Sequence, residues 1–67
     1  MYRYYCIMRP PKNDWLPHTI LEEESFEERR YIPDIDRMVW GWVEYAFELT
    51  MQEVFDYGLI MQPREDE

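Results

Sequence analysis

The sequence contains few of the residues that small domains use to reinforce a fold or to carry out chemistry. Of its 67 residues, one is a cysteine and one is a histidine. A single cysteine excludes an internal disulfide, and these two residues cannot supply the four nitrogen or sulfur ligands of a structural zinc site. A lone free cysteine fits a reducing compartment, so we expect a cytoplasmic protein.

Positive charge and long apolar runs are also scarce. Seven lysine or arginine residues stand against fifteen aspartate or glutamate residues, which gives a formal net charge of -8. Nucleic-acid-binding proteins need a basic face, so this balance argues against direct nucleic-acid binding. No apolar run approaches the ~18 residues of a membrane-spanning helix, and no basic segment followed by an apolar stretch indicates a secretory signal.

Large side chains are abundant by contrast. The chain has three tryptophans, six tyrosines, three phenylalanines and five methionines, but only two glycines. This composition argues against disorder. A chain of this size buries only about 60% of its unfolded surface, so it needs a bulky core, a partner or a second copy of itself. We expect one domain over residues 1–63 and an acidic tail over residues 64–67.

Two segments have the composition of β-strands. Residues 2–8 are rich in β-favouring side chains, and the prolines that follow end this segment because proline cannot donate to a ladder. Residues 38–47 form the clearest strand, and bulk on both of its faces indicates a central position. Gly41 indicates a bulge or a close approach within it, and residues 33–36 are typical of a turn.

Residues 18–30 allow two predictions. The run from Ser25 to Glu28 matches a capping box, and glutamate favours a helix. The sparse apolar periodicity instead favours a strand over about 19–24, a turn, and a second strand near residues 30–32. We favour the strands.

A short helix near the C-terminus has the strongest local signal. Thr50 and Glu53 form a capping box, which predicts a helix over residues 51–57, and Gly58 is placed for the left-handed residue after it. Residues 59–61 then pack or add an edge strand. The sequence therefore predicts an α+β fold, a small antiparallel sheet of three or four strands with one short C-terminal helix.

No residue pattern indicates catalysis. His18 could act as a base, but no nucleophile stands near it, and Ser25 is the only serine. Cys6 alternates within a strand and is expected to be a small buried side chain. We therefore predict a non-enzymatic protein without a cofactor or a bound metal.

Two features are candidates for binding a partner. Five glutamates within seven residues repel one another. They fit a solvated face, but also a surface that steers the protein to a basic groove. Exposed aromatic residues carry interface hot spots, although Trp40 and Trp42 are more typical of a core. The candidate partner-binding residues are Glu22, Glu23, Glu24, Glu27, Glu28, Tyr5 and Trp15.

The segments Met1-Tyr2-Arg3-Tyr4-Tyr5, Arg9-Pro10-Pro11 and residues 31–53 together resemble a group of small uncharacterised proteins carried by bacterial phages and mobile elements. Small acidic phage proteins resemble inhibitors of host defence in charge and size, which is an analogy rather than a site argument. The resemblance implies an accessory protein of a mobile element. From the charge, the aromatic residues and this analogy, the hypothesis that we favour is a phage-borne inhibitor that acts in the host cell on a nucleoprotein with a basic groove, such as a CRISPR effector. Two alternatives are an oligomer that sequesters a nucleotide signal between aromatic rings, and a structural or assembly module.

Overall fold

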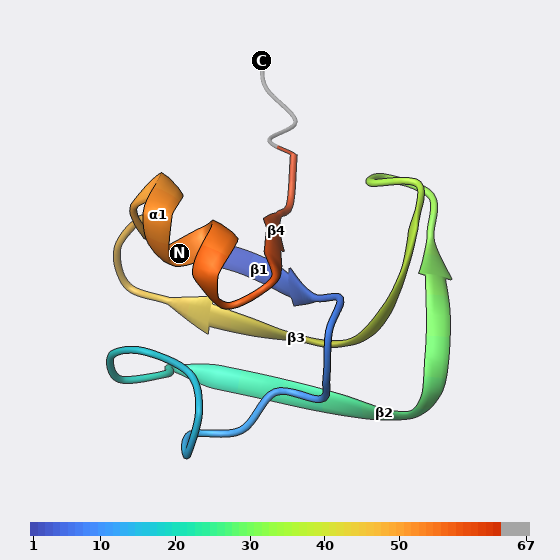
Figure 1. The fold of residues 1–67 in the computed structure, drawn as a ribbon, viewed down its shortest axis with the longest axis horizontal. Helices are drawn as coiled ribbons and strands as arrows, with labels where there is room; N and C mark the ends of the chain where they lie inside the picture. The colour runs from blue at the N-terminus through green and yellow to red at the C-terminus, as the bar shows by residue number, and fades with distance from the viewer. Residues whose placement is uncertain (64–67) are drawn as a thin grey trace.

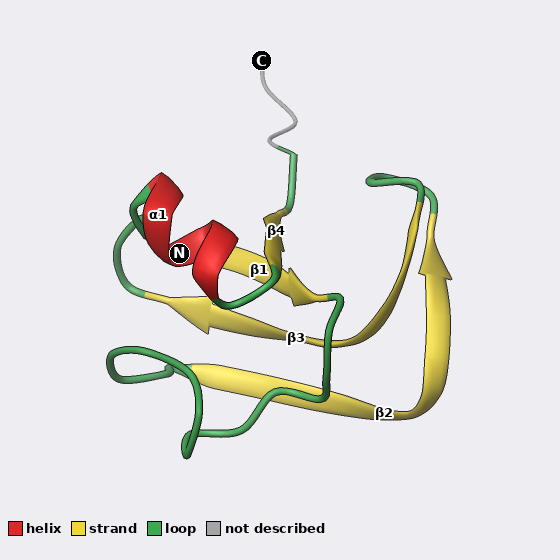
Figure 2. Cartoon of the chain, viewed as in Figure 1, coloured by secondary structure: helices red, strands yellow, loops and turns green. Residues whose placement is uncertain are grey.

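The computed structural model of the chain describes residues 1–63, which form one four-stranded antiparallel sheet and one short helix (Figures 1 and 2). The sheet order is β2-β3-β1-β4. The architecture is mostly sheet, in agreement with the predicted small antiparallel sheet and C-terminal helix. The predicted tail over residues 64–67 lies outside the described residues. The elements are β1 (Tyr2–Cys6), β2 (Glu22–Ile32), β3 (Arg37–Tyr45), α1 (Met51–Asp56) and β4 (Leu59–Met61).

Strand β3 is an interior strand, as predicted, and it pairs with both β1 and β2. Alternate side chains point to opposite sides of a strand. Val43 and Tyr45 are fully buried on one side, whereas Trp40 and Trp42 are half-buried on the other. Neither tryptophan belongs to the buried core cluster, which includes Val43 and Tyr45 on the opposite side of β3, and the partial exposure expected for Trp42 is confirmed.

The core lies on one face of the sheet, and two tyrosines dominate it. Tyr4 of β1 and Tyr45 of β3 are fully buried, with their rings edge to face and their centroids 6.1 Å apart. The Tyr45 hydroxyl donates a hydrogen bond to the Pro17 carbonyl at 2.7 Å, and the Tyr4 hydroxyl accepts one from the Leu49 N–H at 2.8 Å. These bonds satisfy the buried hydroxyls and fix the covering segments onto the sheet. The other buried members of the cluster are Cys6, Leu16, Val43, Leu49 and Leu59.

Strand β2 is one continuous strand, where the sequence predicted two strands and a turn. Ser25 pairs with Gly41 and Arg30 with Val39, so residues 26–29 of β2 oppose only Trp40. This is a β-bulge, which bends a strand without ending it, and Figure 1 shows β2 turning upward there. The helical alternative is wrong because the backbone of β2 bonds to β3 instead.

Gly41 lies where three segments meet. A Cβ atom at this position would stand 2.8 Å from the Pro11 Cδ atom and closer still to the Glu24 carbonyl oxygen. The Ser25 hydroxyl donates to the Pro11 carbonyl at 3.3 Å and holds the loop against the same spot. The prediction that Gly41 allows a close approach is confirmed, because a side chain there would displace backbone atoms.

Helix α1 begins at the predicted capping box. The Thr50 hydroxyl accepts from the Glu53 N–H at 3.1 Å, and the Glu53 carboxylate accepts from the Thr50 N–H at 3.0 Å. Gly58 has a φ of +62°, the left-handed conformation predicted for it, and α1 ends at Asp56, one residue before the predicted end. Among residues 1–63, no helix has the length and apolar character needed to cross a bilayer.

The close approach at Gly41 predicts a loss of stability in Gly41→Ala. The added methyl group meets a backbone carbonyl that cannot rotate away, so we expect the free energy of unfolding to fall by about 1–3 kcal/mol, as for other overpacked sites. Urea unfolding followed by tryptophan fluorescence measures this. Thr19→Ala at an exposed position is the control and should change stability by less than ~0.5 kcal/mol. A Gly41→Ala variant that unfolds like the parent would contradict the observed packing.

The buried Tyr45 hydroxyl predicts a loss of stability at alkaline pH. Burial raises the pKa of Tyr45 to about 12. A raised pKa means that the contribution of this group is fully present below the ordinary tyrosine pKa of about 10 and is lost as the pH rises through 12. Tyr45→Phe should lower stability by about 1 kcal/mol at pH 7, because the Pro17 carbonyl loses its partner. Its urea midpoint should then fall less than the parent's between pH 7 and pH 11, and an equal fall in both proteins would count against this reading.

Candidate functional site

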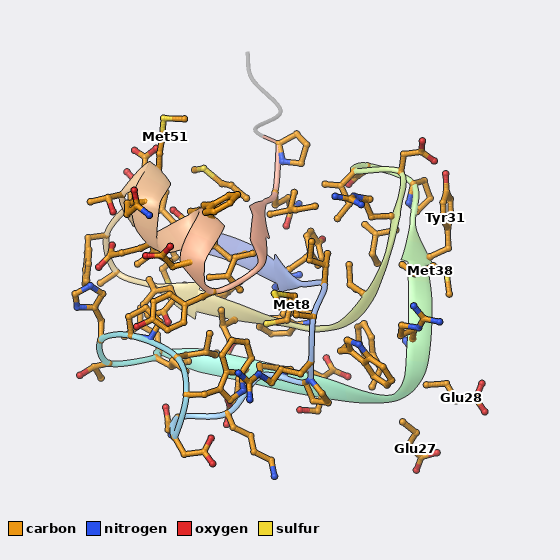
Figure 3. The ribbon with its side chains drawn as sticks, in the orientation of Figure 1. Met8, Glu27, Glu28, Tyr31, Met38 and Met51 are labelled. Atoms are coloured by element: carbon orange, nitrogen blue, oxygen red, sulfur yellow. The ribbon has the colours of Figure 1, made fainter. Side chains whose placement is uncertain are left out.

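The five predicted glutamates lie together on β2, which forms one edge of the sheet. We call Glu22, Glu23, Glu24, Glu27 and Glu28 the acidic edge. All five side chains are exposed. In Figure 3, Glu27 and Glu28 stand at the outer corner of the bend in β2 and point away from the rest of the molecule. The β-bulge thus presents part of the cluster on a convex corner, where a partner can reach it.

The carboxylates of the acidic edge are not held in ion pairs within residues 1–63. None of its five carboxylates forms an ion pair with a described residue. The ion pairs found among residues 1–63 lie elsewhere and join Arg3 to Glu44 and His18 to Glu53.

The two arginines that follow the acidic edge in the sequence lie against rings instead. The Arg29 guanidinium stands 5.6 Å from the centre of the Trp40 ring, and that of Arg30 stands 4.4 Å from the Phe26 ring. Cation–π contacts of this kind occupy the guanidinium groups. Their positive charges still offset part of the negative field, but five glutamates against two arginines leave residues 22–30 with a net negative charge.

The two predicted aromatic anchors do not join the acidic edge. Only 6% of Tyr5 is exposed, and its hydroxyl donates to the Gln62 side chain at 3.3 Å. The expectation that Tyr5 offers an exposed ring is therefore wrong. Its neighbours in the sheet are Trp42 and Ile60, which flank its ring on the two adjacent strands.

Trp15 is half-buried, and its side chain contacts other residues of the loop before β2. Its indole N–H donates to the Pro10 carbonyl at 2.9 Å, and the Arg9 guanidinium lies 4.7 Å from its ring centre. The ring also packs beside Tyr57, with the centroids 6.4 Å apart. Trp15 thus fastens the loop to the core, and only part of its ring is open to a partner.

A second surface was not predicted from the sequence. Helix α1, β4, the segment after β1 and the start of β3 enclose an apolar groove of about 820 Å³. We call this the apolar groove. Met8, Met51 and Phe55 line it and are strongly exposed, and Figure 3 shows Met51 projecting from α1. Met51 and Phe55 are four residues apart in a helix, a spacing that could have indicated a shared apolar face.

Comparison with family models gives one match. Residues 1–64 match the family model DarA_C, described as Defence against restriction A C-terminal. The chain belongs to the DarA_C family. The match covers nearly the whole sequence and indicates a phage domain that takes part in defence against restriction. No curated protein and no solved structure matches the chain.

DarA_C membership refines the expectation drawn from the sequence. The coarse prediction of a phage anti-defence protein is confirmed, and restriction is the kind of defence that the family description names. A CRISPR effector, given above as an example of a target, is not part of that description. The description also names no residues, so the surface through which this DarA_C domain acts has to be argued from its structure.

The side chains of this DarA_C domain that could carry chemistry have structural partners. Cys6 is buried, and burial raises the pKa of its thiol to about 12, which keeps it protonated and unreactive. His18 Nε2 lies 2.6 Å from the Glu53 carboxylate. The Ser25 hydroxyl donates to the Pro11 carbonyl. Among the described residues, no group of histidine, cysteine and acidic side chains is arranged to hold a metal ion.

Glu53 links the loop before β2 to the start of α1, which predicts an acid-sensitive step. The hydrogen bond from the Thr50 N–H lowers the pKa of the Glu53 carboxyl, and the contact with His18 lowers it further. A lowered pKa means that the contribution of Glu53 is present above its ordinary value of 4.5 and is lost as the pH falls below it. We expect the urea midpoint to fall between pH 6 and pH 3.5, and to fall less in Glu53→Gln, which keeps a capping side chain without the charge. Glu28→Gln on the acidic edge is the control, and an identical fall in all three proteins would refute the role of Glu53.

Proposed function

We propose that this DarA_C domain is a non-enzymatic inhibitor of host restriction. In this proposal it acts in the cytoplasm of the host cell and binds a restriction protein through the acidic edge. The acidic edge occupies a basic surface that the restriction protein uses for DNA. The observation that carries the proposal is the cluster of exposed glutamates on β2, none in an ion pair with a described residue, in a chain that belongs to the defence-against-restriction family.

The spacing of the carboxylates supports competition with DNA. Five carboxylates fall within seven residues, and a strand rises about 3.3 Å per residue, so the acidic edge carries roughly one charge per 5 Å of strand. One strand of duplex DNA carries one phosphate per ~3.4 Å of helix axis. A groove whose lysines and arginines are spaced for phosphates therefore meets a similar density of negative charge on β2.

The net charge of the chain supports the same mode of binding. A formal charge of -8 on 67 residues raises the association rate with a basic surface through long-range steering. The same charge keeps the domain away from DNA itself, so it would not compete with the restriction protein for the nucleic acid.

The alternative of a nucleotide-sequestering oligomer has less support. A phosphate group needs available guanidinium or ammonium groups. Arg3 forms an ion pair with Glu44 and lies 3.9 Å from the centre of the Trp42 ring, while Arg29 and Arg30 lie against rings. Arg3 is thus already paired with a carboxylate, and the proposed function assigns it to the stability of the sheet.

Competition with DNA tests the proposal. A purified restriction complex of the host is bound to a fluorescent DNA duplex, and the domain is added until the duplex is displaced, as measured by anisotropy. Glu27→Gln/Glu28→Gln removes two charges from the acidic edge, and Asp14→Asn/Asp34→Asn removes two exposed charges elsewhere. Exposed ion pairs are worth about 0.2–1 kcal/mol each, so the first variant should weaken displacement by about 2- to 30-fold. The second should match the parent.

The salt dependence of displacement distinguishes binding through charges from binding through apolar contacts. Displacement by the parent should weaken steadily between 0.05 and 1 M salt, where the screening length shortens to ~3 Å. The Glu27→Gln/Glu28→Gln variant should show a shallower dependence than the parent. A flat salt profile would refute binding through the acidic edge, and binding to the complex without displacement of DNA would refute occupation of the DNA surface.

A further inference from the structure

The apolar groove is independent of the acidic edge and has no role in the proposed function. It is lined by residues of α1 and β4, by Ile7 and Met8 after β1, and by Arg37 at the start of β3. Figure 3 shows Met51 far from Glu27 and Glu28, so the two surfaces are separate. The apolar groove can therefore be disrupted without touching the acidic edge.

The exposure of the apolar side chains in this groove is unusual for a helix that packs on a core. None of the residues of α1 is buried. Met51 is 88% exposed and Phe55 81%, and Met8 across from them is 64% exposed. Only Val54 of α1 packs against the core cluster. Contiguous exposed apolar groups that line a groove are typical of interaction sites rather than of an ordinary surface.

The shape of the groove favours a protein segment over a small molecule. A small-molecule site encloses 70–90% of its ligand, but Met51 and Phe55, which line this groove, are themselves 88% and 81% exposed. Methionine is flexible and polarizable, and surfaces rich in it accommodate the apolar side chains of amphipathic helices. The occupant that fits is a segment with one apolar face.

The charges around the groove favour a basic occupant. Glu48 and Asp56 line it on the side of α1, whereas Arg37 lines it on the side of β3. Neither carboxylate forms an ion pair with a residue in the described range 1–63. A second copy of the chain would bring the same two carboxylates and a further charge of -8, so self-association meets repulsion.

We propose that the apolar groove binds a cationic amphipathic segment of a protein partner. The apolar face of the segment packs against Met8, Met51 and Phe55, and its lysines or arginines lie beside Glu48 and Asp56. Affinity then comes mainly from the apolar contacts, and the two carboxylates select the charge of the partner.

A labelled helical peptide of leucine and lysine with one apolar face is the probe for this proposal, and fluorescence anisotropy at 0.15 M salt is the measurement. The parent should bind it, and Phe55→Ser should weaken binding at least ~10-fold, as the loss of an aromatic anchor does. Tyr31→Ser is the control, because Tyr31 is also an exposed aromatic residue but lies outside the groove. It should bind within about threefold of the parent, as should Glu27→Gln/Glu28→Gln.

Charge selection is tested with a peptide in which glutamate replaces every lysine. The parent should bind this glutamate peptide at least ~10-fold more weakly than the lysine peptide. In Glu48→Gln/Asp56→Asn, the difference in affinity between the two peptides should be smaller. Equal binding of the two peptides would overturn the proposed basic partner, and unchanged binding by Phe55→Ser would overturn the groove as the site.

Sedimentation of the parent as a dimer that Phe55→Ser dissociates would show that a second copy fills the groove. Because Phe55 is exposed, thermal unfolding of Phe55→Ser should match the parent, and a lowered midpoint would contradict the assignment of Phe55 to a free surface.

Discussion

The edge-to-face contact between Tyr4 and Tyr45 is the interaction on which the rest of the structure depends. The two rings come from the paired strands β1 and β3, and each hydroxyl holds a segment that covers the sheet, one at Pro17 and the other at Leu49. A sheet with one covered face needs its cover held in place, since a small domain buries little surface in total. The tyrosines provide both the apolar core and the polar links to the cover.

The parts of the fold that could be predicted from the sequence are those that local interactions determine. The capping box of Thr50 and Glu53 and the left-handed Gly58 depend on residues within one turn, and the structure contains both. The path of β2 could not be predicted in the same way. Strand β2 is held by hydrogen bonds to β3 and bends at the bulge opposite Trp40. Neither feature can be predicted from the local propensities of a glutamate-rich segment.

The same distinction applies to the candidate site. Charged side chains are almost always exposed, so the exposure of the acidic edge follows from residue type alone. The burial of Tyr5 depends on its neighbours Trp42 and Ile60 in the two adjacent strands. The apolar groove needs Met8 and α1 to meet in space. Such juxtapositions follow from the order of the strands, which composition and spacing do not specify.

The position of the glutamates on an outer strand of the sheet has a consequence for the protein in concentrated solution. The outer edge of β2 offers backbone groups that another strand could pair with, and dense carboxylates are one means by which proteins prevent such edge-to-edge polymerisation. That protection depends on ionised side chains. The surface proposed for partner recognition therefore also opposes edge-to-edge pairing with other strands.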